Sequence, residues 1–144
     1  MSFGIDVNVL LYASDASSDK HDRAANFLRR CAEADELFCL AWATVMGYLR
    51  MATHPRIFAS PLTPKQAADN MQVLLALPHC RVIGEQEGFW DVYCGIASDV
   101  PARGNLVPDA HLAAVLRQNG VLRLYTNDRD FRKFKFLDVC DPFA

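Results

Sequence analysis

Four aspartates lie within or next to segments with the pattern of a regular element: Asp6, Asp109, Asp128 and Asp130. Asp6 interrupts the apolar run GIDVNVLL, Asp109 begins a helical pattern, and the other two follow the apolar segment VLRLYT. Carboxylates about 4 Å apart would repel each other by roughly 4 kcal/mol per pair at an effective dielectric near 20. A divalent cation removes that repulsion, and carboxylate and water oxygens suit Mg²⁺ or Mn²⁺ rather than zinc. If the fold gathers these side chains, they predict such an ion.

The elements that must position them alternate along the chain. Apolar, β-branched segments predict strands, and amphipathic segments between them predict helices. This order predicts an α/β fold with a mostly parallel sheet covered by helices on both faces. In such sheets functional groups lie at the carboxyl ends of the strands. The predicted strands are 3–13, 36–42, 80–86, 121–126 and 138–143, and the predicted helices lie within 14–34, 43–54, 63–77, 88–100 and 108–120.

Each aspartate also has an ordinary structural explanation. Asp109 could simply favour the positive end of its helix, which is worth about 0.3 to 1 kcal/mol. Asp128 and Asp130 could form turns by bonding their own backbone. Asp6 is harder to explain in this way, because a charged residue inside an apolar strand is seldom buried without a partner. Asn8, two residues on and so on the same face of the predicted strand, could orient the Asp6 carboxylate.

Length and composition set the broad class. The chain has 144 residues, of which 51% are hydrophobic, so we expect one domain over residues 1–144. The net charge of -2 gives no overall attraction to nucleic acid or to an anionic membrane, so a polyanion would need a local basic patch. Five widely spaced cysteines favour neither a disulfide framework nor a zinc site. With no membrane-length apolar run, the expected location is the cytoplasm.

Three segments together resemble one family. The segments IDVNVLLYA, LVPDAHLAA and YTNDRDFRKF occur in the order found in PIN-domain ribonucleases, in particular the VapC toxins of bacterial toxin-antitoxin pairs. The likeness covers nearly the whole chain, and YLRMATHPRIF is similar to a further segment of one toxin subgroup.

The resemblance implies a three-layer α/β/α sandwich and a metal-dependent endoribonuclease that hydrolyses RNA phosphodiester bonds. It matches Asp6, Asp109 and Asp128 to the family's Mg²⁺ ligands and Asp130 to a further catalytic aspartate, and Mn²⁺ is expected to substitute. It also implies a homodimer, inhibited by a cognate VapB-like antitoxin. The apolar surfaces of NFLRRCAEA (26–34) and VMGYLRM (45–51) are where we expect that antitoxin to make contact.

One position departs from the family pattern. Many PIN ribonucleases carry a glutamate in the helix before the arginine that Arg50 matches, but this chain has Gly47 there. The missing carboxylate leaves the number of metal ions open. With the other four acids present, we interpret Gly47 as a subgroup feature and expect one weakly bound ion.

Substrate binding needs positive charge around this acidic centre. Basic side chains lie on and after the predicted helix 43–54, and others crowd the segment after position 128. Such runs are commonly solvated surface, but beside a carboxylate cluster they could hold phosphates. The predicted substrate-binding residues are Asn8, Arg50, Arg56 and Arg129, within a wider basic set that includes His54, Arg132, Lys133 and Lys135.

Two rival functions come from other classes. A receiver-like phosphoacceptor would need two adjacent acids after the first strand and a lysine after the last, and the sequence supplies neither. A PIN-like module that binds RNA but cuts it weakly or not at all is the stronger rival, and Gly47 is the observation that favours it. His111, Phe89 and Trp90 are interpreted as structural residues.

Overall fold

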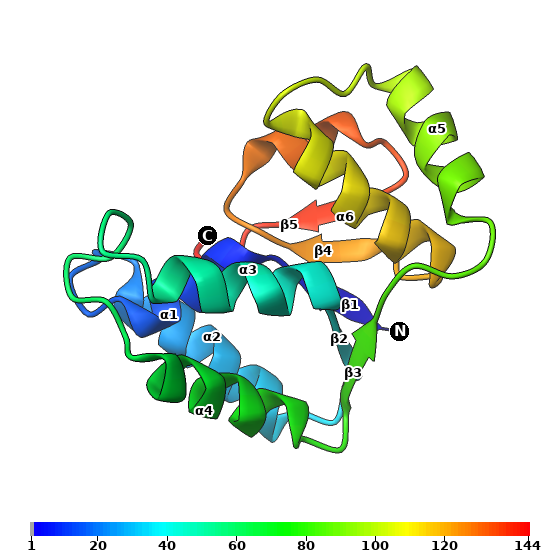
Figure 1. Cartoon of the computed structure of the whole chain (residues 1–144). Helices are drawn as coiled ribbons and strands as arrows, with labels where there is room; N and C mark the ends of the chain where they lie inside the picture. Colours follow the sequence, from blue (N-terminus) through cyan, green and yellow to red (C-terminus); the bar gives the residue numbers. More distant parts are fainter. Residues whose placement is uncertain (1) are drawn as a thin grey trace.

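The computed structural model describes residues 2–144 and contains five parallel strands in the order β3-β2-β1-β4-β5. Helices separate most of the strands along the chain (Figure 1). The predicted α/β class and parallel sheet are confirmed. In chain order the elements are β1 (Phe3–Ile5), α1 (Val7–Ser14), α2 (His21–Glu33), β2 (Phe38–Ala41), α3 (Trp42–Ala52), α4 (Pro64–Leu75), β3 (Cys80–Ile83), α5 (Phe89–Asp99), α6 (Leu106–Gln118), β4 (Arg123–Tyr125), the 3₁₀ helix η1 (Arg129–Lys133) and β5 (Asp138–Cys140).

The sheet is covered on both faces, which makes the predicted three layers. Alternate side chains of a strand point to opposite faces, so Phe38 and Leu40 of β2 pack with helices α1 to α4. Cys39 and Ala41 of the same strand pack with α5, α6 and η1 instead. On the α6 face, a Cβ atom at Gly4 would lie 2.8 Å from a methyl group of Leu116. A glycine at this position of β1 therefore lets α6 approach the sheet closely.

The predicted first strand, 3–13, is wrong beyond its first residues. The strand ends at Ile5, and residues 7–14 form helix α1. The transition from strand to helix occurs at Asp6, which is the N-cap residue of α1. Its backbone is extended, and its Oδ1 accepts a hydrogen bond of 2.7 Å from Val7 N. The apolar run VNVLLYA is buried as a helix, and an unbroken apolar run is compatible with either element.

The other helices lie close to their predicted positions. Thr63 caps α4, and Gln66 completes a capping box with it, as the TPKQ sequence predicts. Helix α6 begins at Leu106, two residues before the predicted start at Pro108. Proline is tolerated in a first helical turn, where its missing N–H would have no intrahelical partner. Asp109 consequently lies inside the first turn of α6.

Two further features concern the whole described chain. Among residues 2–144, no helix is both long enough and apolar enough to cross a membrane. All five cysteines are free thiols, and burial raises the pKa of Cys31 and of Cys80 to about 11.

Candidate metal centre

The adjacent carboxyl ends of β1 and β4 place the first pair of aspartates. Ile5 is paired with Tyr125, and Asp6 N donates a hydrogen bond of 3.0 Å to Tyr125 O. Asp6 therefore leaves β1 beside the residues that leave β4, and Asp128 follows only three positions after Tyr125. Parallel strands thus bring together side chains more than 100 residues apart in the sequence, as the fold class predicts.

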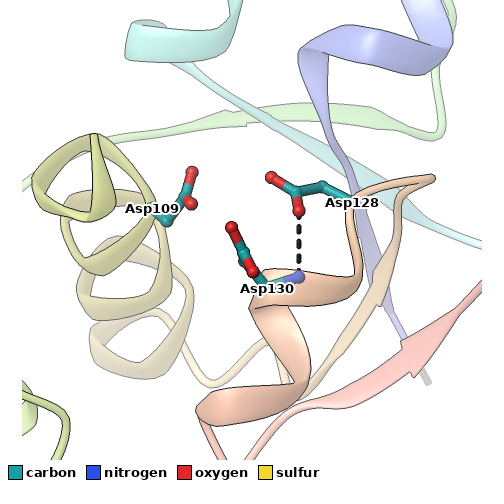
Figure 2. Close-up of side chains that lie close together, drawn as sticks. All are labelled: Asp109, Asp128 and Asp130. Atoms are coloured by element: carbon teal, nitrogen blue, oxygen red, sulfur yellow. Dashed lines mark hydrogen bonds between the residues drawn. The ribbon is translucent and has the colours of Figure 1, made fainter.

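Three carboxylates converge at this edge. Oxygens of Asp109, Asp128 and Asp130 all lie within 4.8 Å of one another. Figure 2 shows Asp109 reaching across from α6 toward the other two, which come from the β4–η1 connection. Asp128 caps η1, because its Oδ1 accepts a hydrogen bond of 2.9 Å from Asp130 N. This bond fixes the two aspartates relative to each other.

Asp6 lies beside this group rather than within it. It is buried, at 7% exposure, and it lines a pocket of about 220 Å³ together with Asp109. Asn8 Nδ2 donates a hydrogen bond of 3.3 Å to Asp6 Oδ2. The predicted orienting contact from Asn8 is therefore present, although it is made from the first turn of α1 and not along a strand face.

Thr126 joins these groups, and sequence reasoning missed it. Its side chain is buried, and its hydroxyl donates a hydrogen bond of 2.7 Å to Asp6 Oδ2. The Thr126 hydroxyl oxygen in turn accepts hydrogen bonds from Asp128 N at 3.0 Å and from Asn8 Nδ2 at 3.2 Å. The only sequence signal was a hydroxyl residue between a strand and an acidic turn. One hydroxyl group thus fixes the positions of Asp6 and of the Asp128 backbone.

The electrostatics are those of crowded acids. Burial raises the pKa of Asp109 to about 7, with further contributions from the negative charges of Asp128, Asp6 and Asp130. Burial also raises the pKa of Asp6, while its hydrogen bonds from Thr126 and Val7 act in the opposite direction. Lys133 Nζ lies 3.6 Å from Asp130 Oδ1 and partly offsets this charge. Folding alone gains nothing from this crowding, so the donor set fits a bound cation.

The other predicted residues are only partly brought to this centre. Arg50 and Gly47 of α3 line the same pocket as Asp6 and Asp109. Arg129 is exposed between Asp128 and Asp130 in the chain, whereas Arg56 is exposed in the segment after α3 and does not line the pocket. The helix that carries Gly47 therefore faces the acidic centre, as its position before Arg50 predicts.

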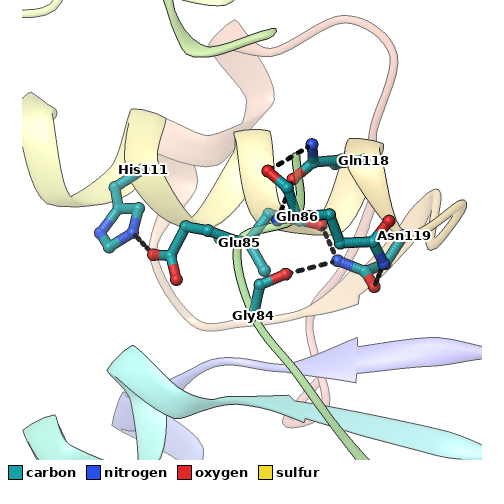
Figure 3. Close-up of polar contacts among 7 residues, drawn as sticks. Gly84, Glu85, Gln86, His111, Gln118 and Asn119 are labelled. Atoms are coloured by element: carbon teal, nitrogen blue, oxygen red, sulfur yellow. Dashed lines mark hydrogen bonds and ion pairs between the residues drawn. The ribbon is translucent and has the colours of Figure 1, made fainter. Parts of the chain in front are cut away.

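A polar network fixes the helix that carries Asp109. Glu85 is paired with His111 Nε2, and this contact lowers the pKa of Glu85 (Figure 3). Further along α6, Asn119 Nδ2 donates a hydrogen bond of 3.0 Å to Gly84 O, and Gln118 Nε2 donates to the carbonyls of Gln86 and Glu87. These contacts tie the second turn and the C-terminal end of α6 to the β3–α5 loop. His111 has this positioning contact, in agreement with its interpretation as structural.

The donor set selects the kind of ion. Three carboxylates within 4.8 Å, with a fourth nearby, offer only hard oxygen ligands. Oxygen donors suit Mg²⁺ or Mn²⁺, whereas zinc sites are dominated by thiolate and imidazole. Such an ion, when bound between carboxylates, acidifies water and offsets negative charge on a phosphate. The centre is therefore suited to hydrolysis of a phosphodiester.

Comparison with known proteins gives a consistent result. The profile of the PIN domain family matches residues 5–137. Ribonuclease VapC48 of Mycobacterium tuberculosis is 43% identical over 144 residues, covering 100% of this chain and 99% of the relative. VapC ribonuclease Mb2897 of Mycobacterium bovis is 37% identical over 133 residues, covering 92% and 90%.

A solved structure has the same fold at low sequence identity. The structure of VapBC-1 from nontypeable Haemophilus influenzae superposes with a TM-score of 0.71, covering 100% of both chains at 16% identity. At this identity the likeness establishes the architecture, which agrees with the strand order and layers described above.

Proposed function

This chain belongs to the PIN-domain family, within its VapC ribonucleases, and from that membership we propose that its acidic centre cleaves RNA as the toxic component of a type II toxin-antitoxin system. The convergence of Asp109, Asp128 and Asp130 carries the proposal, because hydrolysis through a bound divalent cation requires no nucleophilic side chain. The rival RNA-binding module is not favoured, since the relatives are named ribonucleases and four of the expected acids are present.

Each side chain has a distinct part in this proposal. Asp6, Asp109 and Asp128 hold the ion, and Asp130 lies close enough to add an oxygen or to orient a bound water. Thr126 and Asn8 keep the Asp6 carboxylate in position. Arg50, which lines the same pocket, and Arg129, exposed next to Asp128 in the chain, would contact phosphates of the RNA strand.

The proposed ion is Mg²⁺, with Mn²⁺ able to replace it. Gly47 contributes no carboxylate, so we expect one weakly bound ion whose remaining ligands are waters. Mn²⁺ generally binds such ligands more tightly and dehydrates more readily. At equal concentration Mn²⁺ should therefore support faster cleavage than Mg²⁺.

A cleavage assay on total RNA tests the function. The wild-type chain should cut RNA with Mg²⁺ and stop when a chelator is added, and Asp109→Asn should show no cleavage while remaining folded by circular dichroism. The matched control is Asp69→Asn, a change of the same type on the exposed face of α4. Cleavage that persists in Asp109→Asn, or in the presence of chelator, would contradict the proposed mechanism.

The proposed partner is a VapB-like antitoxin, and one groove has a suitable shape for it. Helices α1, α2 and α4 border an open groove of about 320 Å³ whose walls include Leu10, Leu28 and Met71. Tyr48 lies at its floor and is hydrogen-bonded to Ser14 Oγ at 2.7 Å. Leu28 and Tyr48 belong to the two segments where the sequence predicts antitoxin contacts. An apolar face of a partner helix would fit this groove.

Growth measurements test the toxin assignment. Expression of this chain alone should arrest growth, and co-expression of the small protein encoded beside it should restore growth. The inactive Asp109→Asn chain, produced at the same level, separates toxicity from overexpression. Normal growth with soluble, active wild-type protein would contradict a toxin.

The remaining proposals are a homodimer and a cytoplasmic location. Trp42 and Met46 of α3 and Trp90 of α5 are at least half exposed, which is unusual for side chains of this size and suits a contact with a second copy. Light scattering after gel filtration should give twice the chain mass, and Trp90→Glu should give the monomer.

Free thiols and an RNA substrate favour the reducing cytoplasm.

A further inference from the structure

A further groove shares no lining residue with the pocket that holds Asp6 and Asp109. It has a volume of about 360 Å³ and runs between the end of α5, the last turns of α6 and the η1–β5 connection. Its apolar lining includes Ile96, Val100 and Phe136, and three basic side chains border it. Those three are Arg117, Lys133 and Lys135.

The charge of this groove is opposite to that of the whole chain. Three cations face one acid, Asp99, in a protein with a net charge of -2. Among residues 2–144, neither Arg117 nor Lys135 has an ion-pair partner. The Arg117 guanidinium instead lies 4.9 Å from the ring centre of Phe136. Two exposed, uncompensated cations beside an apolar lining suit a ligand with phosphates and flat rings.

Lys133 connects the groove to the acidic centre. It borders the groove, and its Nζ also lies 3.6 Å from Asp130 Oδ1. Helix α6 gives the second connection, because Asp109 and Arg117 are eight residues apart on it, or about 12 Å. A strand whose scissile phosphate lies at the carboxylates would therefore reach the groove within a few nucleotides.

We propose that the groove bordered by Arg117, Lys133 and Lys135 binds the nucleotides of single-stranded RNA next to the scissile phosphate, with phosphates on the cations and a base against Phe136. The inference rests on the proposed function, and it names where that substrate continues beyond the metal centre. Lys133 would be free to contact a phosphate if a bound cation offset the charge of Asp130, its present ion-pair partner.

Salt-dependent RNA binding tests the groove separately from cleavage. The parent is Asp128→Asn, which should not cut, and the ligand is a fluorescein-labelled single-stranded oligoribonucleotide measured by anisotropy over a series of salt concentrations. In this background, Lys135→Gln and Arg117→Gln should each weaken binding several-fold at low salt. Each should also reduce the slope of log affinity against log salt by about 0.7, as expected for one lost phosphate contact. Arg117→Lys should keep the slope of the parent.

The matched control is Lys65→Gln, which removes the same charge from the exposed face of α4. It should leave both affinity and slope unchanged. If the groove variants behave like Lys65→Gln while the parent binds RNA, the groove proposal is wrong and the proposed function stands. If the parent fails to bind RNA and the wild type fails to cut it, both are wrong.

Discussion

The hydroxyl of Thr126 donates a hydrogen bond of 2.7 Å to Asp6 Oδ2, and this contact joins the residue that ends β1 to the segment that leaves β4. The same hydroxyl oxygen accepts from Asp128 N, so both the Asp6 carboxylate and the turn that carries Asp128 depend on it. A side chain outside the proposed ligand set therefore sets the geometry of two carboxylates that we propose as metal ligands.

Replacing Thr126 by valine should reduce RNA cleavage by about 10- to 100-fold, the usual cost of losing a partner that orients a metal ligand. The shape of the side chain is kept, but Asp6 loses a donor and Asp128 N loses its acceptor. The metal requirement for half-maximal activity should rise. Thr126→Ser keeps the hydroxyl and should retain most activity. Full activity in Thr126→Val together with a loss in Thr126→Ser would show that the methyl packing matters and the hydrogen bonds do not.

The sequence predicted the position of the site better than its internal contacts. An aspartate within the first predicted strand and another after a later one, in an α/β pattern, predicted that Asp6 and Asp128 lie at one edge of a parallel sheet. The pattern did not reveal that Asp6 ends its strand, because VNVLLYA is apolar enough for either a buried strand or a buried helix. What decides between them is a cap hydrogen bond of one side chain, Asp6 Oδ1 to Val7 N.

Contacts between distant segments were the least predictable part. Thr126 meets Asp6 across 120 positions, and nothing in the composition of either segment requires this pairing. Lys133 belonged to a run of basic residues that is ordinarily solvated surface. Only the turn of η1 shows that it faces Asp130 and borders a groove. Periodicity predicts elements, whereas side-chain partners depend on how those elements pack.

The raised pKa of Asp109 gives a stability prediction for the metal-free protein. Its pKa rises from 3.8 to about 7 on folding, so the folded state holds this proton more tightly than the unfolded chain does. The resulting stabilisation is present at low pH and is lost as pH increases from about 4 to about 7. Asp109→Asn removes the ionisable carboxyl group and therefore this pH dependence. In chelator, the asparagine variant should therefore melt at a higher temperature than wild type at pH 8, and the difference should shrink at pH 5.

Thermal unfolding followed by circular dichroism at the two pH values, with and without Mg²⁺, measures this effect. Added Mg²⁺ should raise the melting temperature of the wild type and leave that of Asp109→Asn nearly unchanged. A variant less stable than wild type at pH 8 in chelator would indicate that Asp109 is primarily a structural residue.

The network that fixes the C-terminal end of α6 should matter for stability rather than for chemistry. Asn119 Nδ2 donates to Gly84 O at 3.0 Å and to Val115 O at 2.8 Å, and its Oδ1 accepts from Gln86 Nε2 at 2.7 Å. Asn119→Ala should lower the free energy of unfolding by about 1 to 3 kcal/mol, since Gly84 O loses its donor and Gln86 Nε2 loses its acceptor, whereas Val115 O keeps the backbone hydrogen bond from Asn119 N. Urea denaturation measures this, with Gln72→Ala on the exposed face of α4 as the control. Cleavage at low temperature should stay near the wild-type rate.

Gly47 offers a test of where α3 lies relative to the metal. It lines the same pocket as Asp6 and Asp109, and a Cβ atom there would meet only Met51 Cε at 3.5 Å and Val7 Cγ2 at 3.8 Å. These are ordinary contact distances, so a Cβ atom fits at position 47 without moving the backbone. Replacing Gly47 by a residue with a higher helix propensity should also stabilise the helix by roughly 0.5 to 1 kcal/mol.

Gly47→Glu should consequently tighten binding of Mg²⁺ and Mn²⁺, because it adds a fourth or fifth carboxylate to a site that now lacks one. Titration calorimetry should show one weak ion in the wild type and a several-fold lower Kd in the glutamate variant. Gly47→Gln has the same size and helix propensity without the charge, so it should bind metal as the wild type does. Equal affinities in the glutamate and glutamine variants would mean that position 47 does not reach the ion. Two tightly bound ions in the wild type would mean that the carboxylates already present are sufficient to bind a second ion.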